Sequence, residues 1–267
     1  MENSAEIHGP DARTASPEEI LALVHDSRDE VIERLLENPR FQENHLCLLL
    51  ARKDLSTVLL ERISGHRDWM GSYRVRRALA FHPKVPQLLG MRLVRELYAQ
   101  DLVELTFSPS GNPAIRHLAE ELVLAKLPQL PPGQKLTLAR RGSGRIKGAL
   151  LIDGCQEALS VVLDSPVLNE GHVLQALARI TLPARVVTAI ANHGRWSNIY
   201  AVRLALLRNS QTPLARVLVF LPTISLTDLR ILSKSVSVPS SFQPHIRREL
   251  ANRIQHGNSA MQKYPRV

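Results

Sequence analysis

The sequence predicts an all-α protein built as a solenoid of repeated helical units, and three observations lead to this prediction. Residues 39–86 align without a gap with residues 166–213, at an offset of 127 positions, and sixteen of the 48 aligned residues are identical. Apolar residues recur in both stretches at spacings of three and four, which is the pattern of an amphipathic helix. No sustained alternating run of β-branched residues indicates a strand. An ungapped internal match of this length indicates a duplicated multi-helix unit, and such units usually stack into a solenoid.

The first helix is expected after a polar leader, residues 1–15. Ser16-Pro17-Glu18-Glu19 has the features of a helix start, because serine caps, proline suits the first turn and Glu19 can complete a capping box. The leader has no apolar run, and nowhere do about 18 apolar residues follow one another, so we expect neither a secretory signal nor a membrane span. These features predict a cytoplasmic protein.

Three short helices are expected in each copy of the duplicated unit. Three apolar sets recur, each on one helical stripe. They comprise Leu46, Leu49 and Leu50 with Val173, Ala176 and Leu177; Leu59, Leu60 and Ile63 with Val186, Val187 and Ile190; and Val75, Ala78 and Leu79 with Val202, Ala205 and Leu206. Prolines are tolerated at turns and first helical positions, so Thr212-Pro213 predicts another helix start.

The domain prediction is one solenoid over residues 16–255, with the duplicated units at about 31–105 and 158–232. Irregular helices are expected to connect them over 106–157, including an apolar helix at 115–127. A last helix is predicted from about Phe242 to Arg253, followed by a basic tail over 256–267.

Two segments carry a resemblance to known repeat families. Val75-Arg76-Arg77-Ala78-Leu79 leads into His82-Pro83, and Val202-Arg203-Leu204-Ala205-Leu206 leads into Thr212-Pro213. The chain thereby resembles leucine-rich repeat variant and HEAT-type α-solenoids over about two thirds of its length. The resemblance implies a right-handed, armadillo-type superhelix and a scaffold or binding role. Some HEAT-like bacterial proteins are DNA alkylation-repair glycosylases, but no catalytic carboxylate of theirs matches a position here.

Charge is distributed unevenly along the chain. Residues 1–45 contain 11 acidic and 4 basic residues, whereas residues 46–267 contain 14 acidic and 30 basic residues. A basic body favours an anionic partner, such as an acidic protein surface or nucleic acid. A solvated surface without a partner explains the same composition.

Eight basic residues are the candidate anion-binding or partner-binding residues. They are Arg52, Arg76, Arg140, Arg141, Arg145, Lys147, Arg179 and Arg203. Arg52/Arg179 and Arg76/Arg203 recur at equivalent positions and are expected to form a regular ridge, or else to neutralise helix ends and pair with acids. The other four surround the glycines of residues 140–148, whose backbone N–H groups are expected to bind an anion, or else to form a helix-end turn.

Catalysis, metal binding and cofactor binding have no positive evidence in the sequence. His45/His172, His66/His193, Trp69/Trp196 and Tyr73/Tyr200 recur with the repeat and are therefore interpreted as caps or packing residues. No nucleophile elbow, zincin motif or paired carboxylates are recognisable. We therefore expect a noncatalytic scaffold that binds an acidic protein. The alternatives are sequence-independent binding of duplex nucleic acid, with or without repair chemistry, and an unrecognised hydrolase or transferase.

Overall fold

The computed structural model describes residues 11–108 and 112–262, with side chains up to residue 255. Over these residues the chain forms 18 α-helices and three short 3-10 helices and no strand, so the all-α prediction is confirmed. Most of the leader, residues 1–10, and the last five residues of the expected tail lie outside the described residues. Two compact units divide the chain, and the second begins at Leu127.

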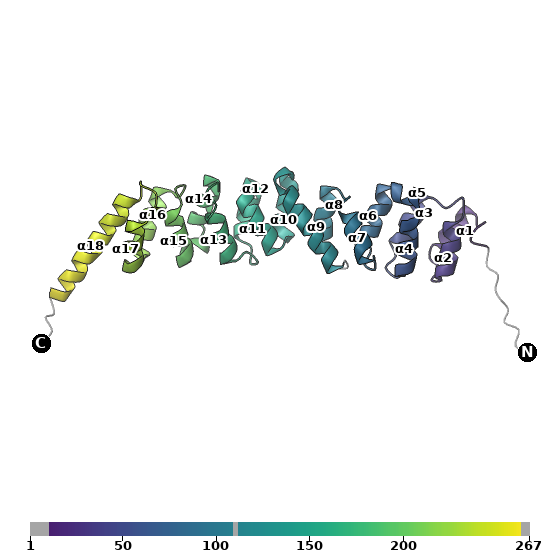
Figure 1. Ribbon diagram of the computed structural model, residues 1–267, viewed down its shortest axis with the longest axis horizontal. Coiled ribbons are helices and arrows are strands. Elements are labelled where there is room, and N and C mark those ends of the chain that lie inside the picture. The colour runs from purple at the N-terminus through teal and green to yellow at the C-terminus, as the bar shows by residue number, and fades with distance from the viewer. Residues whose placement is uncertain (1–10, 109–111, 263–267) are drawn as a thin grey trace, which may run out of the picture. The chain divides into compact units, whose positions relative to one another are not determined.

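The first unit contains nine helices, most of them two to three turns long (Figure 1). They are α1 (Pro17–Leu23), α2 (Asp29–Leu36), α3 (Glu43–Leu50), α4 (Thr57–Gly65), α5 (Arg67–Gly71), α6 (Tyr73–Phe81), α7 (Gln87–Val94), α8 (Ala99–Thr106) and α9 (Pro113–Lys126). Helix α3 packs beside α6, and α7 packs beside α9, so alternate helices form two rows.

The second unit has the same alternation of helices. They are η1 (Leu127–Gln129), α10 (Pro132–Arg141), α11 (Gly144–Asp153), α12 (Gln156–Leu163), α13 (Glu170–Leu177), α14 (Ala184–Asn192), η2 (Trp196–Asn198), α15 (Tyr200–Arg208), α16 (Leu214–Phe220), η3 (Leu221–Thr223), α17 (Leu226–Lys234) and α18 (Gln243–Gln262). One row contains α11, α13 and α15, and the other contains α10, α12 and α14.

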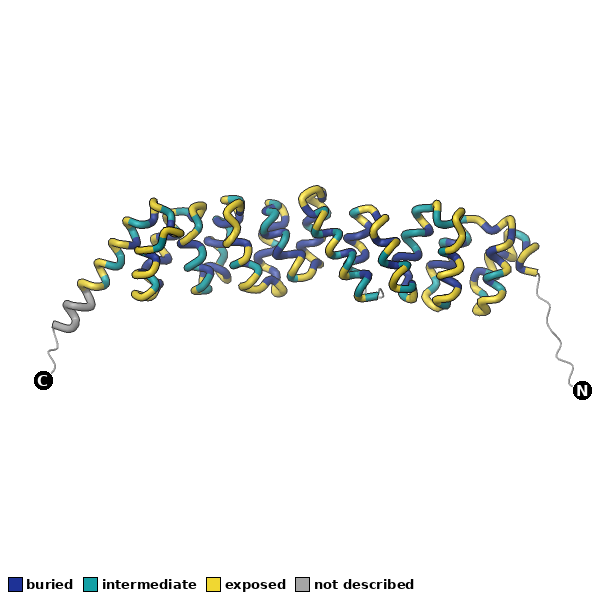
Figure 2. Tube along the Cα trace, viewed as in Figure 1, coloured by how far each residue is buried: buried dark blue, intermediate teal, exposed yellow. Residues whose placement is uncertain are grey.

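The core of each unit lies between its two rows of helices (Figure 2). The apolar sets expected from the sequence supply it, since Leu46, Leu60 and Val75 in the first unit are fully buried, as are Val173 and Val187 in the second. Each helix thus places its apolar stripe against neighbouring helices and leaves its polar face to solvent.

Helix boundaries follow the local chemistry. Ser16 accepts a hydrogen bond from the Glu19 N–H while Glu19 accepts one from the Ser16 N–H, so the expected capping box is confirmed. Helix α16 begins directly after Pro213, which confirms the predicted start. Gly154 ends α11 in the left-handed conformation, which glycine adopts without steric strain.

Four helix pairs begin and end at positions 127 residues apart. They are α2 and α12, α3 and α13, α4 and α14, and α6 and α15. Four further pairs, α1 with α11, α5 with η2, α7 with α16 and α8 with α17, match this offset to within three residues at each end, and α9 and α18 match it to within three residues at their starts. Here, the residue 127 positions further on is called the counterpart. The helix correspondence thus extends well beyond the aligned residues 39–86.

Three details of the helix arrangement were not predicted. Helix α9 packs on α7 and α8, whereas α10 packs on α11 and α12, and the boundary between the two compact units falls after Lys126. A short fourth helix, α5, or its counterpart η2, follows the second helix of each predicted three-helix group. The last helix continues to Gln262, past the expected start of the tail at residue 256.

Candidate anion-binding groove

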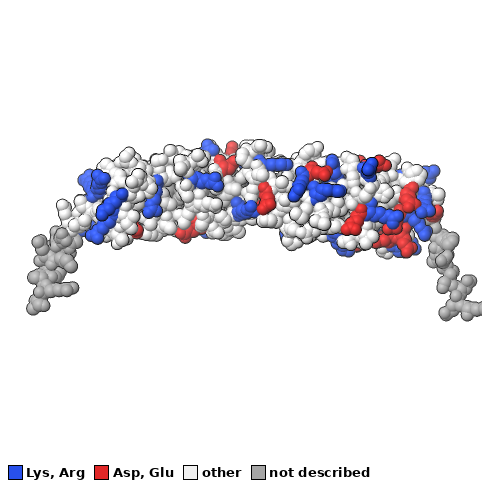
Figure 3. All heavy atoms as spheres, viewed as in Figure 1, with Lys and Arg blue, Asp and Glu red and all other residues white. Residues whose placement is uncertain are grey.

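The two units differ strongly in charge. Residues 1–126 contain 16 Lys and Arg against 19 Asp and Glu, which gives a net charge of −3. Residues 127–267 contain 18 Lys and Arg against 6 Asp and Glu, which gives +12. On the face drawn in Figure 3, basic side chains outnumber acidic ones over α13–α17. The second unit is therefore the region of the chain that attracts anions.

Most acidic side chains of the second unit have a partner within it. The pairs are Asp153 with Lys135, Glu157 with Cys155, Asp164 with His193, Asp228 with Tyr200 and Ser225, and Glu249 with Arg253. Two of these carboxylates, Asp153 and Glu249, pair with a lysine or an arginine, namely Lys135 and Arg253. The remaining positive charge of the unit is not compensated by its own acids.

The Arg52 side chain, in the first unit, makes its hydrogen bonds and its ion pair within the fold. Its side chain is only 13% exposed, and Nη1 donates to the carbonyls of Val24 and Asp26 at 2.6 and 2.7 Å. Nη2 pairs with Asp54 at 2.6 Å, which holds the Asp54 pKa at about 2. The guanidinium group thus joins α3 to the end of α1 and is not available to a partner.

Arg76 and Arg203 also have intramolecular partners. Arg76 forms an ion pair with Glu96 at 2.8 Å. Arg203 donates from Nε to the Ser197 carbonyl at 2.6 Å and from Nη2 to the Asn198 side chain at 3.0 Å. Three of the four recurrent arginines therefore stabilise helix ends or pair with an acid, and they do not form a free cationic ridge.

Arg179 is the exception among the recurrent arginines. It is exposed and makes no side-chain hydrogen bond or ion pair with any residue that the structure describes. Its position next to the end of α13 is the counterpart of Arg52, but Thr181 stands where the first unit has Asp54. The carboxylate that holds Arg52 has no equivalent here.

Arg179 lies in a groove of about 400 Å³ at the C-terminal ends of α13 and α15. A second exposed arginine, Arg208, also lines it and likewise makes no hydrogen bond or ion pair with a described residue. The loop before α18 forms the rest of the lining. The lining residues are Leu177, Ala178, Arg179, Ile180, Arg208, Asn209, Ser210, Val236, Ser237, Val238, Pro239 and Ser240.

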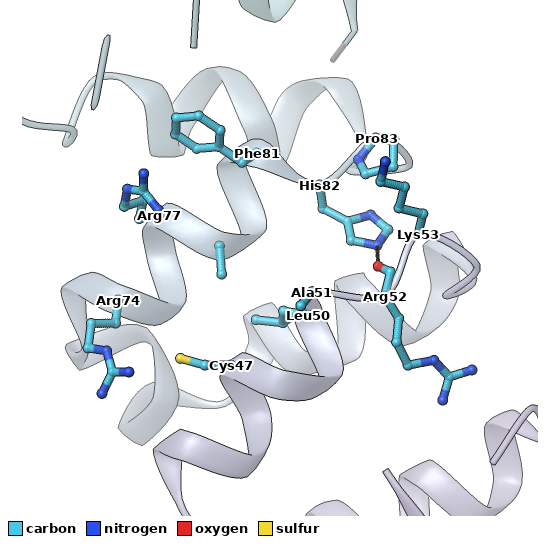
Figure 4. Close-up of a pocket in the computed structure, with 11 residues that line it drawn as sticks. Cys47, Leu50, Ala51, Arg52, Lys53, Arg74, Arg77, Phe81, His82 and Pro83 are labelled. Atoms are coloured by element: carbon cyan, nitrogen blue, oxygen red, sulfur yellow. Dashed lines mark hydrogen bonds between the residues drawn. The ribbon is translucent and has the colours of Figure 1, made fainter. Parts of the chain in front are cut away.

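The first unit has a hollow of about 410 Å³ at the corresponding place (Figure 4). Seven of its lining residues, Leu50–Lys53 and Phe81–Pro83, are counterparts of groove residues. Its chemistry differs, because the Arg52 guanidinium points away from the hollow and Phe81 stands where the groove has Arg208. Cys47 contributes a half-buried thiol, whose pKa burial raises above its usual value.

Acidic residues compensate two arginines at this first hollow. Arg77 pairs with Asp101 and Glu104, both at 2.7 Å, and stacks 4.7 Å from the Phe81 ring centre. Arg74 donates to Asn44 at 3.0 Å and lies 3.5 Å from Glu43. Neither lining contains a carboxylate, but Arg179 and Arg208 of the second unit form no ion pair with a described residue, so they are the arginines available to an anion.

The glycine-rich segment 140–148 forms a turn between two helices. Ser143 caps α11 by accepting a hydrogen bond from the Ile146 N–H, as its counterpart Ser16 caps α1. A Cβ on Gly144 would lie 2.9 Å from His172, and one on Gly148 would lie 3.1 Å from it. These glycines allow α11 to approach α13 closely, which explains their presence without an anion.

One of the four cations of this segment lies inside the fold, whereas the other three are exposed. Arg140, Arg141 and Arg145 are exposed at the ends of α10 and α11. Lys147 is only 5% exposed, and its Nζ donates to Ser165 Oγ at 2.7 Å. Burial lowers the pKa of Lys147 below its ordinary value. Because Lys147 faces the interior, it is not a surface contact.

The recurrent histidines mostly cap helices. His45 Nδ1 accepts from the Gln42 N–H at 3.0 Å and His172 Nδ1 from the Asn169 N–H at 3.4 Å, and each pair forms a capping box. His193 bridges to Asp164 at 3.0 Å, whereas its counterpart His66 is exposed. No group of three potential metal ligands occurs among the described residues.

The recurrent tyrosines make matching hydrogen bonds in the two units. The Tyr73 hydroxyl donates to Asp101 and accepts from the Tyr98 N–H. The Tyr200 hydroxyl donates to Asp228 and accepts from the Ser225 N–H; these partners are counterparts of Asp101 and Tyr98. Burial, with the bond to Asp101, raises the Tyr73 pKa to about 12. The contact joins α6 to α8 in the first unit and α15 to α17 in the second.

Sequence reasoning missed Arg208, because it has no arginine counterpart. It could have been found from the lack of acidic residues in the second unit, where Thr181, Thr223 and Ile231 stand at the counterparts of Asp54, Glu96 and Glu104.

Comparison of the chain with protein-family models, curated proteins and solved structures finds no match. Within the described residues, no helix has the length and apolarity needed to cross a bilayer.

Proposed function

We propose that this protein is a noncatalytic helical-repeat scaffold whose second unit binds an acidic protein partner. The observation that carries the proposal is a pair of exposed arginines, Arg179 and Arg208, that make no hydrogen bond or ion pair with a described residue, in a unit of net charge +12. Arginine pairs bidentately with carboxylates, and such pairs are stronger than neutral hydrogen bonds.

The proposal includes the origin and architecture of the chain. The two units are copies of one module, and each has the right-handed, armadillo-type helix arrangement of HEAT and leucine-rich repeat variant proteins. The shared helix bounds and the matching tyrosine contacts support the duplication. A cytoplasmic location is part of the same proposal.

Sequence-independent binding of duplex nucleic acid is the second candidate function. The basic unit favours it, because phosphates attract the same cations. The scarcity of aromatic residues, 4% of the chain, disfavours single-strand binding by base stacking.

Fluorescence anisotropy with the full chain distinguishes the two candidates. The probes are labelled poly-L-glutamate and a short labelled DNA duplex, each titrated at several salt concentrations. We expect poly-L-glutamate to bind at about 50 mM salt and to weaken as salt screens the charges. Binding of the duplex alone, with an affinity that falls steeply with salt, favours the nucleic-acid function. Binding of neither probe refutes both functions.

A further inference from the structure

The groove between the ends of α13 and α15 has the composition of a peptide site. Arg179 lines it from the turn after α13 and Arg208 from the last residue of α15, and neither has a hydrogen-bonding or ion-pairing partner among the described side chains. Two exposed serines in the lining, Ser210 and Ser240, also make no side-chain hydrogen bond within the described part of the chain. The groove thus offers two guanidinium groups and two hydroxyl groups to a ligand.

The groove also has two apolar residues in its lining that are fully exposed. Ile180 and Val236 have relative exposures of 100% and 101%. A free phosphate or a sugar–phosphate backbone has no apolar group to cover them, and no aromatic residue in the lining would stack on a base. A peptide that carries both acidic and apolar side chains satisfies both kinds of lining residue.

We propose that this groove binds an extended peptide segment of a partner protein in which acidic and apolar side chains alternate. Arg179 and Arg208 bind its oxyanions, which are carboxylates or the phosphate of a phosphorylated serine. Ile180 and Val236 cover its apolar side chains. This inference rests on the proposed function and assigns a location and a sequence class to the acidic partner.

One carboxylate, that of Asp228, interacts with Arg208 but lies outside the groove lining. Hydrogen bonds from Tyr200 and Ser225, together with the positive charge of Arg208, lower the Asp228 pKa. Asp228 is therefore ionised but already engaged by two donors. The groove lining itself contains no acidic residue.

Fluorescence anisotropy of the full chain tests the assignment. The probe is a short labelled peptide in which glutamate alternates with valine and serine, and a second arm replaces one glutamate by phosphoserine. The test variant carries Arg179→Gln and Arg208→Gln. The matched control carries Arg140→Gln and Arg247→Gln, which removes two exposed charges of the same unit outside the groove.

We expect the test variant to bind at least about tenfold more weakly than wild type, and the control to lose about threefold or less. Melting temperatures of both should stay near wild type, because none of the four arginines makes a hydrogen bond or ion pair with a described residue. Tighter binding of the phosphoserine peptide identifies phosphate as the preferred oxyanion, and equal or weaker binding identifies carboxylate.

Equal losses in both double variants would overturn the groove while leaving a diffuse acidic-partner function intact. A large drop in the melting temperature of the test variant, with unchanged peptide affinity, would also overturn it and assign the arginines to helix ends. Absence of binding by wild type to both peptides, while poly-L-glutamate binds, rejects the alternating peptide alone.

The apolar part of the proposal has its own test. The double substitution Ile180→Ser and Val236→Ser should lower the affinity for the valine-containing peptide by about three- to tenfold. The same variant should leave unchanged the affinity for a peptide in which serine replaces every valine. Equal effects on the two peptides would contradict an apolar contact.

Discussion

The two units share helix positions but differ in what compensates their arginines. In the first unit, carboxylates at Asp54, Glu96 and Glu104 pair with Arg52, Arg76 and Arg77. Their counterparts in the second unit are Thr181, Thr223 and Ile231. The comparison teaches that the apolar pattern maintains the stack of helices, whereas surface ion pairs contribute little to folding and are free to change. At the three positions corresponding to these arginines, Arg179 is exposed, Arg203 donates to Ser197 and Asn198, and Leu204 replaces Arg77.

The tryptophans show a second difference between the units. Trp196 is fully buried, and its Nε1 donates to the Leu163 carbonyl at 2.8 Å. Trp69 is half-buried and packs edge-on against Phe41, with ring centres 5.9 Å apart. Leu168 occupies the counterpart position of Phe41, so a smaller residue there accompanies the deeper burial of the indole.

The largest expected effect is the loss of stability when Trp196 is replaced. Trp196→Ala should lower the free energy of unfolding by about 3 to 5 kcal/mol, because it leaves a cavity and an unpaired carbonyl. Trp69→Ala should cost about half of that or less, because water already reaches the ring. Urea unfolding followed by circular dichroism measures both. Equal losses would show that the two tryptophans contribute alike despite their different exposure.

Close packing at α11 gives the next effect. Gly144→Ala should destabilise by about 1 to 3 kcal/mol, because its Cβ would lie 2.8 Å from the Val167 carbonyl oxygen and 2.9 Å from His172. Gly133→Ala is the matched control, since no atom lies within 4 Å of its added Cβ. The control should gain up to about 1 kcal/mol from helix propensity. Thermal unfolding compares the two, and a stable Gly144 variant would contradict the close approach.

Matching helix bounds extend further along the chain than the matching residues of 39–86 and 166–213. Residues 39–86 retain many identities, whereas α1 and α11 correspond mainly through Ser16 and Ser143, which cap both helices. A helix at a given position needs an apolar stripe and a cap, so different residues can form helices with the same bounds.

Whether a given charged residue is exposed, buried or paired could not be predicted from the periodicity of the sequence. Arg52 and Arg179 are identical residues at equivalent positions, and a single change, Asp54 to Thr181, accompanies the difference between a nearly buried guanidinium and an exposed one. Lys147 looked like a surface cation because arginines and glycines surround it in the sequence. Its helical position matches the buried Ile20, and this comparison would have indicated its burial.

Lys147 provides a third prediction. Lys147→Ile with Ser165→Ala should stabilise the protein by about 1 to 2 kcal/mol at pH 7, because it replaces a buried amine and its only hydrogen-bond partner by apolar groups. The folded-state pKa of Lys147 is lowered, so wild-type stability rises with pH between that pKa and the unfolded value of about 10.4. The advantage of the variant should therefore shrink towards pH 10. An advantage that does not change with pH would contradict a charged, buried amine.

The smallest effect concerns His82, whose Nε2 donates to the Arg52 carbonyl at 2.8 Å. Burial lowers its pKa, so its contribution to stability is present above the unfolded value of about 6.5 and is lost as pH falls through the folded value. His82→Asn introduces the residue found at the counterpart position, Asn209. The free energy of unfolding of this variant should fall less between pH 7.5 and pH 5 than that of wild type. Urea midpoints at the two pH values measure this, and identical losses would contradict it.

The most direct test of the central claim is an amide chemical-shift map of the full chain during titration with poly-L-glutamate. We expect the shifts to be concentrated at the ends of α13 and α15 and in the loop before α18, with small changes at the corresponding hollow of the first unit. Shifts spread evenly over both units, or concentrated between α3 and α6, would contradict that claim.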